Sequence, residues 1–259
     1  MADRVSFEAV RDLVRAGRRG ALVTVIAGQG LGAKLLVTAE ETEGTLGEAA
    51  LDERAAALAR ELLSGEESAV REVAGRQLFV DVFAPRPRLL IMGAVDFAAA
   101  LARAARQAGF LVTVVDPRER FATSERIPDA HEVVVAWPQE YLAGAPPDDA
   151  TYAAVLTHEP RVDDPTLEAL LKSPVAYIGA MGSRRAHGER LERLRVAGFG
   201  DDDIARISGP IGLDIGAQTP EETAVSILAE VIAAKHGRAG GRLRDRATPV
   251  HFLKERGEL

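Results

Sequence analysis

The segment RLLIMGAVDFAAALARAARQAGFLVTVVD, at residues 88–116, shows how the larger part of this chain folds. It begins with the apolar run 88–93, continues with helical spacing at 96–108, and ends with the β-branched run 110–116. Short apolar runs bounded by turns are typical of strands buried on both faces, with the intervening helix packed over them. The segment therefore predicts a βαβ unit of a parallel sheet.

The same alternation continues toward the C-terminus. Further strand-like runs lie at 131–137, 152–158 and 175–179, and helical spacing recurs at 163–172, 183–197 and 220–236. The last helix has a complete start signal in Thr219-Pro220-Glu221-Glu222: an N-cap, a proline in the first turn and a glutamate three residues after the cap. We therefore expect a Rossmann-like, doubly wound parallel sheet over residues 84–240.

Residues 1–83 show a different order of elements. Helical spacing occurs at 5–16 and 51–63, and strand-like runs occur at 21–27, 33–39, 69–74 and 76–83. The turn-rich Gly28-Gln29-Gly30-Leu31-Gly32 predicts a hairpin or a loop between two of these strands. The fold class is thus α/β, with a smaller N-terminal α+β domain joined through Pro85 and Pro87 to the Rossmann-like domain. Residues 241–259 have no periodicity and are expected to form a poorly structured tail.

Composition excludes several classes of protein. The chain has 259 residues, of which 47% are hydrophobic and 27% charged, and its formal net charge is −7. Such an acidic chain is not expected to bind nucleic acid nonspecifically. The absence of cysteine excludes disulfides, zinc–thiolate sites, iron–sulfur clusters and a thiol nucleophile. Because there is no long apolar run and no signal-peptide pattern, we expect a cytoplasmic protein without a membrane span.

The first strand–helix turn only partly matches a dinucleotide-binding fingerprint. Gly93 supplies the first glycine of G-x-G-x-x-G/A and Ala98 fits the third position, but Val95 replaces the glycine that lets the backbone approach a pyrophosphate. Asp96 should cap the helix and repel a phosphate. Asp116 ends the second strand, where a ribose-binding acid belongs. An NAD(P)-binding oxidoreductase is therefore disfavoured but stays an alternative.

A second glycine-containing turn carries cations. Gly179 and Gly182 free the backbone, Ser183 is a good N-cap, and Arg184 and Arg185 fall in the first turn of the following helix. Cations at this end oppose the helix dipole. An anion held by backbone N–H groups and the guanidinium groups would remove that conflict. A solvated helix end is the structural alternative, and a phosphate-type site is the better interpretation.

Two further places add candidate residues. Asp214 is the single acid in the loop SGPIGLDIGAQ at 208–218, where it could cap backbone N–H groups or accept the paired N–H donors of a pterin or guanine ring. Thr157 and His158 close the fourth strand at its ligand-facing end. No pair of histidines and acids has metal-ligand spacing, and no Ser/His/Asp arrangement is identifiable.

Five stretches carry long motifs: PRPRLLIMGA (85–94), VTVVDPRERFA (112–122), LTHEPRVDDPTLEALL (156–171), YIGAMGSRR (177–185) and GPIGLDIGAQTPEETAVSILAE (209–230). They resemble the XdhC/CoxI family, the accessory proteins of xanthine dehydrogenase and related molybdenum hydroxylases. Residues 32–47 (GAKLLVTAEETEGTLG) are similar to the smaller N-terminal domain of that family.

The resemblance implies a homodimeric accessory protein without an enzymatic activity of its own. Such a protein binds molybdenum cofactor (molybdopterin), protects it during sulfuration by a cysteine desulfurase, and passes it to the large subunit of the apo molybdenum hydroxylase. The candidate cofactor-binding residues are Gly93, Asp116, Arg118, Thr157, His158, Gly179, Gly182, Ser183, Arg184, Arg185 and Asp214.

Two glycine clusters depart from the family pattern. Where the family has GS-x-PR, this chain has the shorter 28–32 segment, and where the family has GGGC-x-E it has Gly47-Glu48-Ala49-Ala50-Leu51-Asp52. A thiol therefore plays no role here. These changes leave open a third alternative, a regulatory scaffold that keeps the fold but has lost the ligand.

Overall fold

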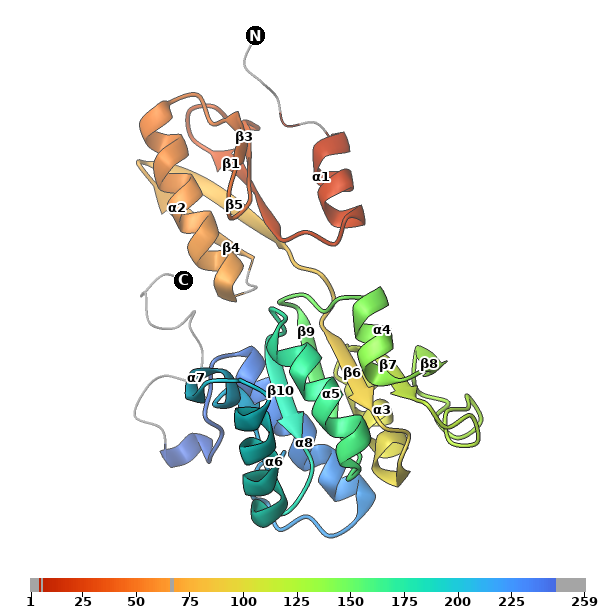
Figure 1. Ribbon diagram of the computed structural model, residues 1–259. Coiled ribbons are helices and arrows are strands. Elements are labelled where there is room, and N and C mark those ends of the chain that lie inside the picture. Colours follow the sequence, from red (N-terminus) through yellow and green to blue (C-terminus); the bar gives the residue numbers. More distant parts are fainter. Residues whose placement is uncertain (1–4, 6, 66–67, 246–259) are drawn as a thin grey trace. The chain divides into compact units, whose positions relative to one another are not determined.

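The computed structural model describes residues 5, 7–65 and 68–245 (Figure 1). Contacts between residues group the chain into two units, of which the first ends at Pro85 and the second begins at Arg86. Each unit has its own sheet and its own hydrophobic core.

The first unit is an antiparallel sheet with a helix packed on one face. Its elements are α1 (Phe7–Arg15), β1 (Gly20–Ala27), β2 (Lys34–Val37), β3 (Thr42–Thr45), α2 (Ala49–Gly65), β4 (Ala69–Val73) and β5 (Arg76–Phe83), with strand order β3-β2-β1-β5-β4. β1 and β2 pair antiparallel, so the 28–32 segment is a hairpin connection. Alternate residues of β1 and β5 pack against Leu51, Ala55 and Ala59 of α2. β3 is absent from the predicted elements because its residues TEGT have no apolar side chain.

The second unit is a six-stranded parallel sheet. Its elements are β6 (Arg88–Met92), α3 (Asp96–Gln107), β7 (Leu111–Asp116), β8 (Glu132–Val135), α4 (Pro138–Gly144), β9 (Thr151–Val155), α5 (Pro160–Leu171), β10 (Tyr177–Ala180), α6 (Arg184–Val196), α7 (Asp201–Ile204), β11 (Ile207–Ser208) and α8 (Pro220–Lys235). The strand order β11-β10-β9-β6-β7-β8 is that of a doubly wound Rossmann sheet, in which the order reverses between β6 and β9.

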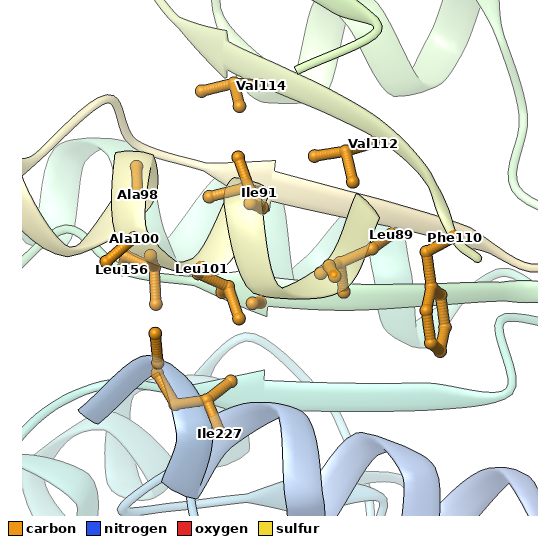
Figure 2. Packing of buried hydrophobic residues seen from close by; sticks show 14 of the residues in the cluster. Leu89, Ile91, Ala98, Ala100, Leu101, Phe110, Val112, Val114, Leu156 and Ile227 are labelled. Atoms are coloured by element: carbon orange, nitrogen blue, oxygen red, sulfur yellow. The ribbon is translucent and has the colours of Figure 1, made fainter. Parts of the chain in front are cut away.

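Helices cover both faces of this sheet, as the apolar runs predict. On one face, Leu89 and Ile91 of β6 pack against α3 and α8 (Figure 2). On the other face, Leu90 and Met92 belong to a second core with α4, α5, α6 and α7. Because neighbouring residues of one strand point to opposite faces, an uninterrupted apolar run fills both cores. The predicted fold class is confirmed.

The differences from the predicted elements are small. α4, α7 and β11 are not among the predicted elements, because they are too short to give a periodic signal. Of the predicted tail at 241–259, Leu243–Asp245 form a 3₁₀ turn, and residues 246–259 lie outside the described residues. Within the described ranges, none of the helices combines the length and the apolar character needed to cross a bilayer.

Candidate functional site

The candidate residues gather at the carboxyl ends of the parallel strands. β6 pairs with β9, and β9 pairs with β10, so the turns that leave these three strands are neighbours at one edge of the sheet. The crevice between the ends of β6 and β9 is the point where strand order reverses, which is where doubly wound sheets bind ligands. Gly93, Thr157 and Gly182 lie on three adjacent turns.

Gly93 is required by its backbone angle and by a close neighbour. Its φ is +112°, and a Cβ atom there would lie 2.5 Å from the Thr157 methyl group. The glycine thus lets the β6 turn approach the end of β9. The expectation that Asp96 caps α3 is wrong: the N-cap is Val95, whose side chain makes no cap hydrogen bond. The helix begins at Asp96 itself, and the exposed carboxylate lies 3.6 Å from Nη2 of Arg126.

Asp116 is fully buried and its carboxylate is fully engaged. Oδ2 accepts from the Ala94 N–H at 2.8 Å and from Arg118 Nη2 at 2.7 Å, while Oδ1 accepts from the N–H and Nε of Arg118, both at 2.9 Å. Burial alone would raise the pKa of Asp116, but these donors outweigh it and hold the pKa below its usual value. A ligand at this edge would therefore meet Arg118, whose side chain is 43% exposed.

Arg118 belongs to a small cationic cluster. The guanidinium carbons of Arg118 and Arg126 lie 4.5 and 5.1 Å from the ring centre of Phe121. Both contacts have the geometry of a cation–π interaction. Arg126 also lines a hollow of about 220 Å³, together with Ala94, Val95, Asp96, Ala99 and Ile127. This cluster flanks the first turn and places positive charge beside it.

The turn between β10 and α6 has the conformation that the sequence indicates. Gly182 has φ +148°, and Ser183 is the N-cap, its hydroxyl accepting from the Ala186 N–H at 3.1 Å. The first turn of a helix leaves further N–H groups without intrahelical acceptors. Arg184 and Arg185 are both exposed, and Arg185 lies 3.3 Å from Glu189.

A buried ion pair that the sequence patterns do not predict supports this turn. Arg190 is 3% exposed and Asp163 is 2% exposed. Nη2 of Arg190 donates to Asp163 Oδ2 at 3.1 Å and to the Met181 carbonyl at 2.9 Å. The Thr157 hydroxyl donates to the other carboxylate oxygen of Asp163. Burial raises the pKa of Asp163 more than these two partners lower it.

Two nitrogens of Arg190, Nε and Nη1, are buried without a partner among the described residues. Nη2 and Nη1 lie 3.8 and 3.9 Å from the place that a Cβ atom on Gly182 would occupy. A buried guanidinium with unused donors is costly unless a water or an anion meets it. The residues at this turn therefore fit a group that supplies acceptor oxygens.

The 208–218 loop is fastened at its beginning and open at Asp214. Glu230 of α8 accepts from the Tyr177 hydroxyl at 2.7 Å and from the Gly212 N–H. Burial and the adjacent Glu230 raise the pKa of Tyr177, so the hydroxyl stays protonated and donates. Asp214 is exposed, and within residues 68–245 it caps no N–H group. Gly179 has a packing role, because a Cβ atom there would lie 2.3 Å from Ile211.

The histidines divide into one exposed and one packed group at this edge. His158, just after β9, is exposed, and its charge lowers the pKa of Asp163 only as the smallest of several effects. His187 of α6 packs on Gly209, and burial together with Arg190 lowers its pKa, so its ring is neutral near pH 7. Across the described residues, no group of three or more His, Asp or Glu side chains could hold a metal ion.

The altered glycine segments of the first unit are tied together by one buried arginine. Arg76 of β5 donates from Nη1 to the Leu46 carbonyl at 3.1 Å and pairs with Glu48. A Cβ atom on Gly28 would lie 3.3 Å from its side chain. The glycines of 28–32 thus make room for Arg76, and this arginine joins the two segments in which the chain departs from the family pattern.

Two family profiles match the chain. One, described as the XdhC Rossmann domain, matches residues 89–231, and the other, described as the XdhC and CoxI family, matches residues 13–74. The chain belongs to the XdhC/CoxI family. The resemblance noted from its motifs is thereby confirmed.

Relatives agree with this assignment. The chain is 35% identical over 160 residues to a protein of Bacillus subtilis described as a probable xanthine dehydrogenase component, covering 61% of this chain and 46% of that protein. It is 31% identical over 175 residues to the uncharacterized protein YqeB of Escherichia coli, covering 66% and 32%. It is 32% identical over 93 residues to the molybdenum cofactor insertion chaperone PaoD of E. coli, covering 36% and 29%. The chain spans less than half the length of each of these relatives.

A solved structure shares both the fold and the family name. A crystal structure described as a xanthine dehydrogenase from Bacillus halodurans is 25% identical and superposes with a TM-score of 0.68. The match covers 90% of this chain and 69% of that chain.

Proposed function

We propose that this chain is an accessory protein that binds molybdenum cofactor and carries it to the large subunit of an apo molybdenum hydroxylase. The proposal rests on the turn between β10 and α6. This turn offers backbone N–H groups, a capped helix start and two cationic side chains to an anion. Its place beside the crevice of an XdhC Rossmann domain gives the anion an identity, because PaoD, a relative, is named for the insertion of that cofactor.

The site residues take different parts in this proposal. Gly182, Ser183, Arg184 and Arg185 attract the phosphate end of the cofactor, and Arg118 contributes from the opposite side of the crevice. Gly93, Asp116, Thr157 and Gly179 shape the turns and hold their neighbours. His158 and Asp214 are exposed and free to meet the rest of the ligand.

Geometry does not favour the oxidoreductase alternative. A ribose-binding carboxylate must have an acceptor oxygen directed at the ligand, whereas Asp116 is buried and bonded to Arg118 and Ala94. Val95 is the N-cap of α3, at the place where a pyrophosphate would need a glycine.

Sulfur for the cofactor has to come from another protein, because the chain has no cysteine. A cysteine desulfurase that carries a persulfide is the chemical class of partner that can supply it. The carrier must then release the cofactor to the hydroxylase, so its site should lie near an interaction surface.

Transfer of cofactor tests the proposal directly. The purified full chain is loaded with molybdopterin, freed of excess ligand and mixed with apo molybdenum hydroxylase, and recovered hydroxylase activity is measured over time. We expect faster and more complete recovery than with the same amount of free cofactor. Recovery no better than with free cofactor would contradict a carrier role and favour the scaffold alternative.

A further inference from the structure

We infer that Arg190, and not the exposed Arg184 or Arg185, is the group that recognises the anion at the turn between β10 and α6, and that the anion is a phosphate monoester. This rests on the proposed function and deepens it, because it assigns the residue that holds the phosphate end of the ligand. Burial, hydrogen-bond partners and the contrast between three arginines on one helix support the assignment.

Burial separates Arg190 from the other two arginines. Arg184 and Arg185 are exposed, with the Arg185 side chain 86% exposed, so water and salt screen their attraction for an anion. Arg190 is 3% exposed and sits below Gly182. A charge in such surroundings acts through a low dielectric and is correspondingly stronger.

The position of Arg190 is fixed before any ligand arrives. One nitrogen, Nη2, is anchored by Asp163 and the Met181 carbonyl, and Asp163 is in turn held by the Thr157 hydroxyl at the end of β9. The anchors take only one of the three guanidinium nitrogens. Nε and Nη1 keep their donors unused among the described residues, although both are buried.

These donors and the start of α6 face the same turn. Both terminal nitrogens of Arg190 lie within 4 Å of the Cβ position of Gly182, and Ser183, the next residue, caps the helix. Any side chain on residue 182 would stand between the guanidinium and the turn. A planar guanidinium together with helix N–H groups is the arrangement that binds phosphate oxygens in two places at once.

Inorganic phosphate is the probe for this site. Binding of phosphate to the full chain is measured by calorimetry at millimolar concentrations, with wild type compared with Arg190→Lys. Lysine keeps the charge but loses the forked donors, and we expect affinity to fall by about ten-fold or more. Arg193→Lys is the matched control, because Arg193 also pairs α6 with α5, through Asp164 at 2.6 Å, but is 41% exposed. It should bind phosphate as wild type does.

A second variant covers the case in which Arg190→Lys does not fold. Ser183→Asp keeps a good N-cap and adds a negative charge at the turn, so the helix is retained while phosphate is repelled. We expect it to lose phosphate binding with an unchanged circular dichroism spectrum. Phosphate binding equal to wild type in a folded Arg190→Lys or in Ser183→Asp, or no phosphate binding by wild type, would overturn the inference.

The cofactor distinguishes this inference from the proposed function. Displacement of bound phosphate by molybdopterin identifies the cofactor's phosphate as the natural occupant. If phosphate binds through Arg190 but molybdopterin does not bind, the anion site stands and the proposed function fails. If molybdopterin binds equally to wild type and Arg190→Lys, the proposed function stands and this inference fails.

Discussion

Gly93 is the residue at which backbone geometry and close packing act together. Substitution by alanine would place a Cβ atom 2.5 Å from the Thr157 methyl at φ +112°. We expect Gly93→Ala to lower the free energy of unfolding by about 3 kcal/mol, combining backbone strain with overpacking. Gly109→Ala is the control: its φ is +89°, but nothing lies within 4 Å of the new atom. Denaturant unfolding should show a clearly smaller loss there, and equal losses would contradict the close approach of β6 to β9.

Asp116 should make stability depend on pH in a defined direction. Its pKa is lower in the folded state, so its contribution is present above the unfolded pKa of about 3.9 and is lost as pH falls through the folded-state value. We expect Asp116→Asn to be less stable than wild type by about 2 kcal/mol at pH 7.

The same series of unfolding experiments, repeated between neutral and strongly acidic pH, checks the sign of this effect. The difference between wild type and Asp116→Asn should shrink as pH falls below about 4. Asp214→Asn, at an exposed position, should match wild type throughout. A constant deficit for Asp116→Asn at all pH values would show that the charge of the carboxylate contributes nothing.

Single residues show what the sequence can and cannot predict at this scale. Ser183 is predictable as an N-cap because its type and position follow a local rule. Arg190 and Asp163 escape prediction because charged side chains are ordinarily at the surface, yet both lie at inward positions of their helices, four residues from Leu194 and Leu167. Opposite charges at inward positions of two neighbouring helices are the available signal. The partners of Asp116 depend on a tertiary contact with Ala94 that no local pattern shows.

At the level of elements, α8 determines where the 208–218 loop lies. Glu230 accepts from the Gly212 N–H and the Tyr177 hydroxyl, and Ser226 donates to the Leu213 carbonyl at 2.6 Å. We expect Glu230→Gln to raise hydrogen exchange of amides 209–216 by several-fold, because the charge-assisted bond is roughly twice as strong as its neutral replacement.

Glu221→Gln is the matched control for that exchange measurement. Glu221 lies on the same helix, is exposed, and has no hydrogen bond to the loop among the described residues. Unchanged exchange in Glu230→Gln would mean that Ser226 and local packing suffice to hold the loop.

Long elements are predicted well because their signals repeat. The capping box at Thr219 and Glu222 is present, and β6, α3 and β7 lie within one or two residues of the ranges expected from 88–116. The short α4, α7 and β11 contain too few residues for periodicity to appear. Their positions are set by the strands they connect.

At the scale of the whole molecule, we expect a dimer. In the first unit, α2 covers one face of the sheet, while Val70 and its cross-strand partner Phe79 lie on the other face. Val70 is 50% exposed, and Phe7 of α1 is 75% exposed. Packing of this unit against a second copy of the chain or against the Rossmann unit would cover such side chains, and a specific contact buries about 1,600 Å². Light scattering at micromolar concentration should give the mass of two chains, and the mass of one chain would contradict the dimer.

Cofactor retention is the most direct measurement of what this chain binds. The purified full chain is incubated with molybdopterin with or without NADH, passed through gel filtration, and the bound pterin is oxidised to its fluorescent product and quantified. We predict a stoichiometric amount of pterin that NADH does not displace. No retained pterin, or sub-micromolar NADH affinity abolished by Asp116→Ala, would contradict cofactor carriage and support the oxidoreductase alternative.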